Sequence, residues 1–183
     1  SAIADYFDAL AAYPEEKESV AALSKIVDGY YELMKRTTDR EKLNSYRMRV
    51  DVVSGYLAER FAGAENMAIM SEAGNAVLSI AAKEKRLNEL ARSDALYMAF
   101  ICNYTRHALA PTYAAQLGGV ALQDAVKLDG DLAAAKYREA IKYFQVMEEN
   151  YTASPFYASA LSSLSTCYDK LGDKVQAIAY LKK

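Results

Sequence analysis

The sequence predicts an all-α protein built from antiparallel helical hairpins, and three observations indicate this class. Only 3 prolines and 8 glycines interrupt the 183 residues, while alanine, glutamate, lysine, leucine and methionine are frequent. These residues are good helix formers. Apolar side chains recur at helical rather than alternating spacing. No Asn-Gly or Asp-Gly pair follows an alternating apolar pattern, so no β-hairpin is expected.

Four helices are expected in the first half of the chain. Their ranges are 3–13, 14–36, 40–61 and 65–90. Pro14 suits the first turn of the second helix, because its missing N–H has no partner at that position. Thr37–Asp39 can cap the third helix, and Gly63 is expected to end it.

Five more helices are expected in the second half. Their ranges are 94–109, 111–128, 132–150, 155–171 and 173–183. Ser93-Asp94 is expected to cap the first of these helices, and Gly118-Gly119 to allow close helix packing in the second. Short turns make each helix pack antiparallel on its neighbour, either as hairpins stacked in series or as a closed bundle.

An internal repeat appears near the C-terminal end. The segment Ala140–Phe144, AIKYF, recurs as AIAYL over Ala177–Leu181, 37 residues later. The segment between them contains one helix and a turn, so the repeating unit is helix–turn–helix. Gly172 can adopt the left-handed conformation that ends a helix, and Asp173 can cap the next one. Ala177 is small enough to let the two helices of this hairpin approach closely.

This segment resembles a tetratricopeptide (TPR) repeat. The matching residues are Leu161, Leu164, Tyr168, Gly172, Asp173, Ala177 and Leu181. Ser165 stands where the family prefers Gly or Ala. The resemblance covers 134–183, and its helix ending in Tyr before a Ser-Pro linker is similar to the TPR subtype of bacterial cell-envelope proteins.

The resemblance implies hairpins stacked into a right-handed superhelix. It implies one α-helical domain over 1–183, with TPR-like hairpins over 112–183. Residues 1–111 would form degenerate repeats with longer helices, or a plain bundle.

The resemblance also implies a function and its surface. The first helices of successive TPR hairpins line a concave face that holds a peptide or a partner protein. On the last repeat the equivalent residues are Ser159, Ser162, Thr166 and Asp169. On the preceding unit they are Tyr113, Gln116, Val120 and Gln123. We therefore expect a non-enzymatic interaction or scaffold module, periplasmic or envelope-associated in a bacterium, with a cytoplasmic location as the alternative.

A second hypothesis is an α-helical bundle that binds a small apolar ligand. Its internal pocket would be lined by the long middle helices and by Met67, Met70 and Met98. An enclosed apolar cavity around these helices would favour this hypothesis, and an open surface without a deep pocket would favour the first.

Composition and motifs argue against other classes. Lys plus Arg number 22 against 24 Asp plus Glu, with a pI near 5.5, so no nucleic-acid partner is expected. No apolar run is long enough to span a bilayer, which leaves a membrane-associated complex open. His107, the single histidine, is expected at a helix end, where the dipole favours its charge. Neither a metal nor a cofactor is expected. Cys102 and Cys167 are expected to be buried free thiols, with a disulfide left open.

Overall fold

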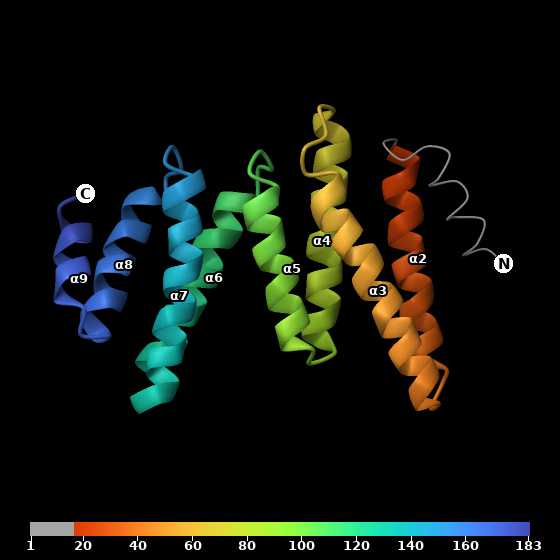
Figure 1. Cartoon of the computed structure of the whole chain (residues 1–183). Helices are drawn as coiled ribbons and strands as arrows, with labels where there is room; N and C mark the ends of the chain where they lie inside the picture. The colour runs from red at the N-terminus through yellow and green to blue at the C-terminus, as the bar shows by residue number, and fades with distance from the viewer. Residues whose placement is uncertain (1–16) are drawn as a thin grey trace. The chain divides into compact units, whose positions relative to one another are not determined.

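The computed structural model describes residues 17–183 and forms eight helices there, with no strand among those residues (Figure 1). The all-α prediction is therefore confirmed, while the helix expected over 3–13 lies outside the described residues. The helices are α2 (Lys17–Lys35), α3 (Arg40–Arg60), α4 (Met67–Arg86), α5 (Leu90–Asn103), α6 (Ala110–Val126), α7 (Gly130–Asn150), α8 (Tyr157–Lys170) and α9 (Lys174–Leu181).

Contacts divide the chain into two compact units after His107. The first contains α2 to α5, and the second contains α6 to α9. Among residues 17–183, every helix is too short or too polar to cross a membrane.

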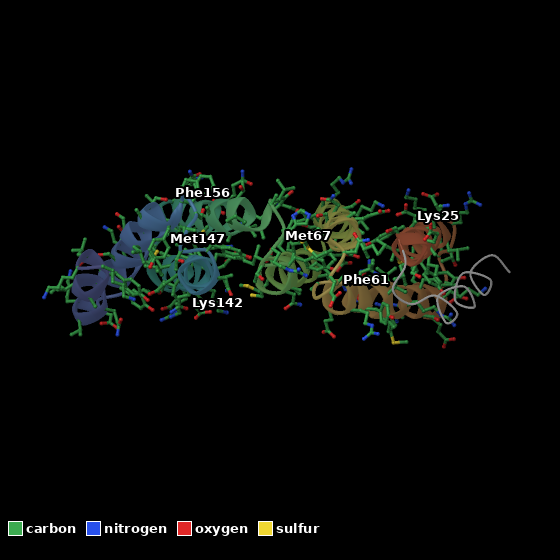
Figure 2. The ribbon with its side chains drawn as sticks, turned by 90° about the horizontal axis from the view of Figure 1, so that it is seen from above. Lys25, Phe61, Met67, Lys142, Met147 and Phe156 are labelled. Atoms are coloured by element: carbon green, nitrogen blue, oxygen red, sulfur yellow. The ribbon has the colours of Figure 1, made fainter. Side chains whose placement is uncertain are left out.

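The first unit consists of two antiparallel hairpins, α2–α3 and α4–α5. Contacts also join α2 to α4, and α3 to both α4 and α5. Seen from above, α2 and α4 lie in one layer and α3 and α5 in the other (Figure 2). The core between them holds apolar and aromatic side chains that are fully buried. The largest are Ile26, Leu57, Phe61, Met70, Phe100, Ile101 and Tyr104.

The second unit also consists of two antiparallel hairpins, α6–α7 and α8–α9. Helix α8 contacts α6, α7 and α9, and Figure 2 shows α6 and α8 in one layer with α7 in the other. Close packing was expected at Gly118-Gly119. A Cβ added at Gly118 would lie only 2.7 Å from the Phe144 ring, whereas one at Gly119 would meet nothing within 4 Å. Only Gly118 therefore serves the α6–α7 contact.

The turn of the α8–α9 hairpin has the expected geometry. Gly172 has a φ of 84°, in the left-handed region. The Asp173 N–H donates to the Tyr168 carbonyl and the Gly172 N–H donates to the Asp169 carbonyl, which is a Schellman motif. The Asp173 side chain then accepts from the Gln176 N–H and caps α9.

The boundary between α4 and α5 differs from the prediction. Helix α4 ends at Arg86 rather than at residue 90, and α5 begins at Leu90. Ser93 therefore does not cap a helix; it lies inside α5 and is 1% exposed. Asn88, with a φ of 61°, supplies the left-handed residue between the two helices.

Two further predictions were wrong. Cys102 is exposed, and only Cys167 is buried; both are free thiols. His107 is not a charged helix end, because its ring is 5% exposed and packs edge-on against Phe100 with centroids 5.0 Å apart. Burial lowers the pKa of His107, although the contact of Nε2 with the Ser71 carbonyl at 3.3 Å opposes this.

Candidate binding surfaces

The residues predicted on α8 form one exposed stripe. They are Ser159, Ser162, Thr166 and Asp169, spaced so that they share a helix face. The Ser159 hydroxyl donates to the Phe156 carbonyl at 2.8 Å, and the Thr166 hydroxyl donates to the Ser162 carbonyl at 3.1 Å. Both donors are thus satisfied within or next to their own helix, which leaves a surface of small side chains.

The single charge of this stripe is neutralised. Lys174 Nζ lies 2.6 Å from the Asp169 carboxylate across the α8–α9 turn. The hydrogen bond and the charge of Lys174 lower the pKa of Asp169. The pair lies at the end of the stripe, so the other three residues of the stripe carry no charge.

The residues predicted on α6 lie on a neighbouring helix of the same unit. Gln116, Val120 and Gln123 are exposed, and Tyr113 is half-buried. Val120 is 54% exposed, which is high for an apolar side chain. Because α6 and α8 touch and share a layer (Figure 2), the two predicted sets belong to one part of the second unit.

These two helices are unusual in their lack of charge. Charged residues make up 25% of the chain, yet none occurs in 108–123 or in 151–168. The exposed faces of α6 and α8 within these runs must therefore be uncharged. Charged side chains normally cover exposed helix faces, so we name this region the α6/α8 surface and treat it as a candidate interface.

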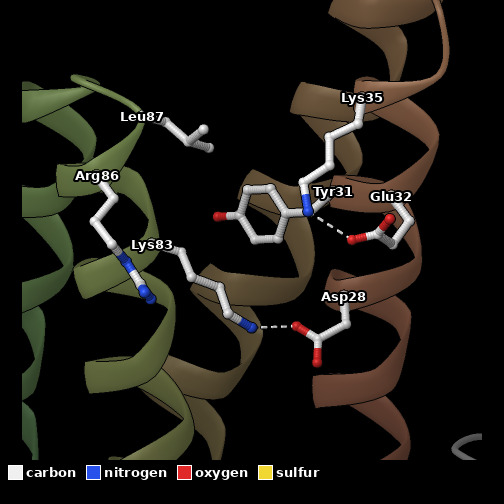
Figure 3. A pocket seen from close by; sticks show the side chains of 7 residues that line it. All are labelled: Asp28, Tyr31, Glu32, Lys35, Lys83, Arg86 and Leu87. Carbon is white, nitrogen blue, oxygen red and sulfur yellow. Dashed lines mark hydrogen bonds and ion pairs between the residues drawn. The ribbon is translucent and has the colours of Figure 1, made fainter.

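A second candidate lies between α2 and α4 in the first unit (Figure 3). This α2–α4 cleft has a volume of about 390 Å³. Its lining residues are Asp28, Tyr31, Glu32, Lys35, Lys83, Arg86 and Leu87. Lys83 pairs with Asp28 across the cleft, and Lys35 pairs with Glu32 along α2 at 2.6 Å (Figure 3). The Tyr31 ring lies beside both pairs, with Lys83 Nζ 5.9 Å from its centroid (Figure 3).

A smaller hollow adjoins the cleft on the side of α3. We call it the Glu84 hollow; its volume is about 240 Å³. Its lining residues are Tyr31, Met34, Lys35, Leu43, Arg47, Glu84 and Leu87. Glu84 is 3% exposed, and one of its oxygens accepts a 2.5 Å hydrogen bond from the Tyr31 hydroxyl. Burial and the bonded carboxylate together raise the pKa of Tyr31.

Sequence reasoning missed the cleft and the hollow. The residues of α2 recur at helical spacing, so a shared face could have been found. The local pattern does not predict which helix packs on that face, because α2 contacts α4 only through tertiary packing. Glu84 in particular lies in a charged stretch, Lys83 to Arg86, that resembles a solvated helix end.

The pocket of the alternative hypothesis gains no support from its methionines. Met67 is 47% exposed and so does not line an enclosed cavity. Met70 is fully buried in the core. In the part of the chain that the structure describes, no group of three or more His, Cys, Asp or Glu side chains is placed to hold a metal ion.

Comparisons with known proteins identify no relative: no family model, no curated protein and no solved structure matches this chain.

Proposed function

We propose that the chain is a non-enzymatic protein-interaction module and that its α6/α8 surface binds an uncharged segment of a partner protein. The observation that carries this proposal is the absence of charged residues over 108–123 and 151–168, which supply most of two touching helices. A charged partner segment would lose hydration there without gaining an opposite charge, so an uncharged segment is the better match.

TPR-like stacking is part of this proposal, and a second hairpin supports it. Leu87-Asn88-Glu89 ends α4 in the way that Leu171-Gly172-Asp173 ends α8. The Glu89 N–H donates to the Glu84 carbonyl and the Asn88 N–H donates to the Lys85 carbonyl, which again is a Schellman motif.

Small buried residues occur at equivalent positions of these two hairpins. Ser165 and Ala177 meet in the α8–α9 hairpin, where the Ser165 hydroxyl bonds to the Ala177 carbonyl. Ala81 and Ser93 occupy the equivalent positions in the α4–α5 hairpin, and both are buried. The likeness of these two hairpins supports the proposal of TPR-like stacking, in which one hairpin unit is repeated along the chain.

The burial of the histidine supports a role without catalysis. His107 is packed against Phe100 and the backbone of Gly74, where a Cβ would lie 2.8 Å from its ring. The His107 ring is therefore not accessible to a substrate. A location in a bacterial cell envelope remains a proposal that rests on the resemblance of the final repeat to envelope proteins.

The proposal is tested by placing a charge on the α6/α8 surface. The intact chain, carrying a photo-crosslinking residue at Gln116, is expressed in its native cell and its crosslinked partner is identified. Val120→Arg and Ser162→Arg should each reduce crosslinking at least about tenfold, because an arginine would be desolvated without a partner charge.

Val175→Arg is the matched control. Val175 lies on α9 of the same unit and is 78% exposed, so its replacement adds the same charge outside the α6/α8 surface. Crosslinking should be unchanged. Equal crosslinking in all three variants would refute the assignment of this surface, and failure of every variant would mean that charge acts non-specifically.

A further inference from the structure

We propose that the Glu84 hollow binds an organic cation, namely an ammonium or guanidinium group carried on an aliphatic stem. The hollow lies on α2, α3 and α4, whereas the α6/α8 surface lies in the other unit. The inference therefore goes beyond the proposed function and stands or falls without it.

The first argument is a buried carboxylate with an unused oxygen. Oε1 of Glu84 accepts from the Tyr31 hydroxyl, but Oε2 has no partner among residues 17–183. Glu84 nevertheless forms part of the wall of the hollow. The unbonded Oε2 is not fully buried, so a cation that enters the hollow can reach it and form a charge-assisted hydrogen bond with it.

The second argument is the balance of charge around the hollow. Lys35 is paired with Glu32 at 2.6 Å, and Arg47 is paired with Glu89. Both cations of the wall are thus neutralised, and the Glu84 carboxylate remains as the uncompensated charge of the lining. An anion would have to break one of these pairs and approach a buried carboxylate, so a cation is favoured.

A further ion pair near the Tyr31 hydroxyl does not change this balance. Arg92 of α5 and Asp51 of α3 both act electrostatically on Tyr31, with opposite effects on its pKa. They lie 2.9 Å apart and compensate each other.

The third argument is the apolar wall and the size of the hollow. Met34, Leu43 and Leu87 offer apolar surface beside the carboxylate. Lysine and arginine bury their aliphatic stems on such surfaces while the charged head meets a polar group. A volume of about 240 Å³ is below the roughly 300 Å³ at which sites for whole small molecules begin. The fit is to a single lysine or arginine side chain of a partner, or to a free alkylamine of that length.

The test is a titration of the intact chain with two probes. These are Nα-acetyl-lysine N-methylamide and butylammonium, each followed by calorimetry and by NMR shifts of Leu43 and Leu87. Saturable binding of either probe is expected. Tighter binding of the lysine derivative would indicate a protein side chain as the ligand, and equal binding would indicate a free amine; both results uphold the site.

Two variants separate the Glu84 hollow from the adjacent cleft. Glu84→Gln keeps an oxygen for the Tyr31 hydroxyl but removes the charge, and should weaken binding at least about tenfold. Asp28→Asn removes a carboxylate from the α2–α4 cleft and should leave the affinity unchanged. Unaltered binding by Glu84→Gln would overturn the proposal.

A third variant keeps the test decisive if Glu84→Gln does not fold. Met34→Lys places an ammonium inside the hollow, where it can reach Glu84 and compete with the probe. It should abolish binding. Binding that survives in Met34→Lys, a wild-type chain that binds neither probe, or binding of acetate or phosphate in their place would each overturn the proposal.

Discussion

The Ser165 hydroxyl donates a 2.8 Å hydrogen bond to the backbone carbonyl of Ala177, and this bond joins α8 to α9 where both residues are buried. Ser165 stands where the family that this segment resembles prefers Gly or Ala. Serine is accepted because its hydroxyl is small and finds a partner directly across the helix crossing. Ala177 has no bulk to hold the helices apart, so the two backbones come close enough for this bond.

Replacing Ser165 tests the value of this bond. Ser165→Ala should lower the free energy of unfolding by about 1 kcal/mol, which is typical for the loss of one hydrogen bond. Urea unfolding followed by circular dichroism measures this. Ser162→Ala on the exposed face of α8 is the control and should change the free energy by less than about 0.5 kcal/mol. Equal losses in the two variants would contradict the role of the bond.

Replacing Ser93 by alanine should raise the free energy of unfolding, whereas replacing Ser165 should lower it. Ser93 occupies the position in the α4–α5 hairpin that is equivalent to Ala177, and its buried hydroxyl has no hydrogen-bond partner. Ser93→Ala removes an unsatisfied polar group and introduces a better helix former. We expect the free energy of unfolding to rise by up to about 1 kcal/mol in the same urea assay. A loss as large as that of Ser165→Ala would show that the Ser93 hydroxyl is in fact bonded.

Replacing the two adjacent glycines of α6 by alanine should change the stability of the protein in opposite directions. Gly118→Ala places a methyl group 2.7 Å from the Phe144 ring and should destabilise the protein by about 1–3 kcal/mol. Gly119→Ala meets nothing within 4 Å and should stabilise it by up to about 1 kcal/mol, since alanine favours a helix interior. Thermal unfolding of both variants provides the comparison. Two variants of the same sign would refute the close approach of α6 and α7 at Gly118.

The histidine should make stability depend on pH. Burial lowers the pKa of His107 in the folded state below its unfolded value of about 6.5. The unfolded chain therefore binds the proton first as the pH falls. The contribution of neutral, buried His107 to the free energy of unfolding is fully present above about pH 6.5. It is lost as the pH falls towards the pKa of His107 in the folded state. It can be measured by urea unfolding between about pH 7.5 and 5.5, where ordinary carboxylates stay ionised.

His107→Gln is the control for this pH dependence. Because His107 is the chain's single histidine, the variant should have a flatter profile over the same range, whatever its absolute stability. An unchanged slope would mean that the histidine pKa is not lowered by folding.

The two cysteines should react at very different rates. Burial raises the pKa of the Cys167 thiol to about 11, while Cys102 is exposed. Thiol reagents attack the thiolate, so at about pH 8 only Cys102 should react quickly in the folded protein. Cys102→Ser should remove the fast phase, and urea should release the slow one. Rapid reaction of both thiols would contradict the burial of Cys167.

Residue-level reasoning succeeded where one local rule decides the structure. Asp39 caps α3 by accepting from the Glu41 and Lys42 N–H groups, and Gly172 ends α8 in the left-handed region, as expected. It failed at α4–α5, because Asn88 provides the left-handed residue in place of a glycine. Leu87-Asn88-Glu89 matches Leu171-Gly172-Asp173, and this signal could have located the turn.

The residues of the candidate binding surfaces also fall into those that could be predicted from the sequence and those that could not. The exposure of Ser159, Ser162 and Gln116 follows from helical spacing, which any amphipathic helix obeys. The burial of Glu84 does not follow from helical spacing. A carboxylate among lysines and arginines is expected to be exposed, and Glu84 is buried because Tyr31 of α2 packs and hydrogen-bonds against it. Only non-local packing decides such a contact.

The sequence alone determined that this chain is helical and where most helices begin and end, because propensity, capping and periodicity act over a few neighbouring residues. Tertiary structure alone decided which helix faces meet, that His107 and Glu84 are buried, and that Cys102 is not. Those properties depend on contacts between helices far apart in the chain, and no local pattern encodes the partner of a face.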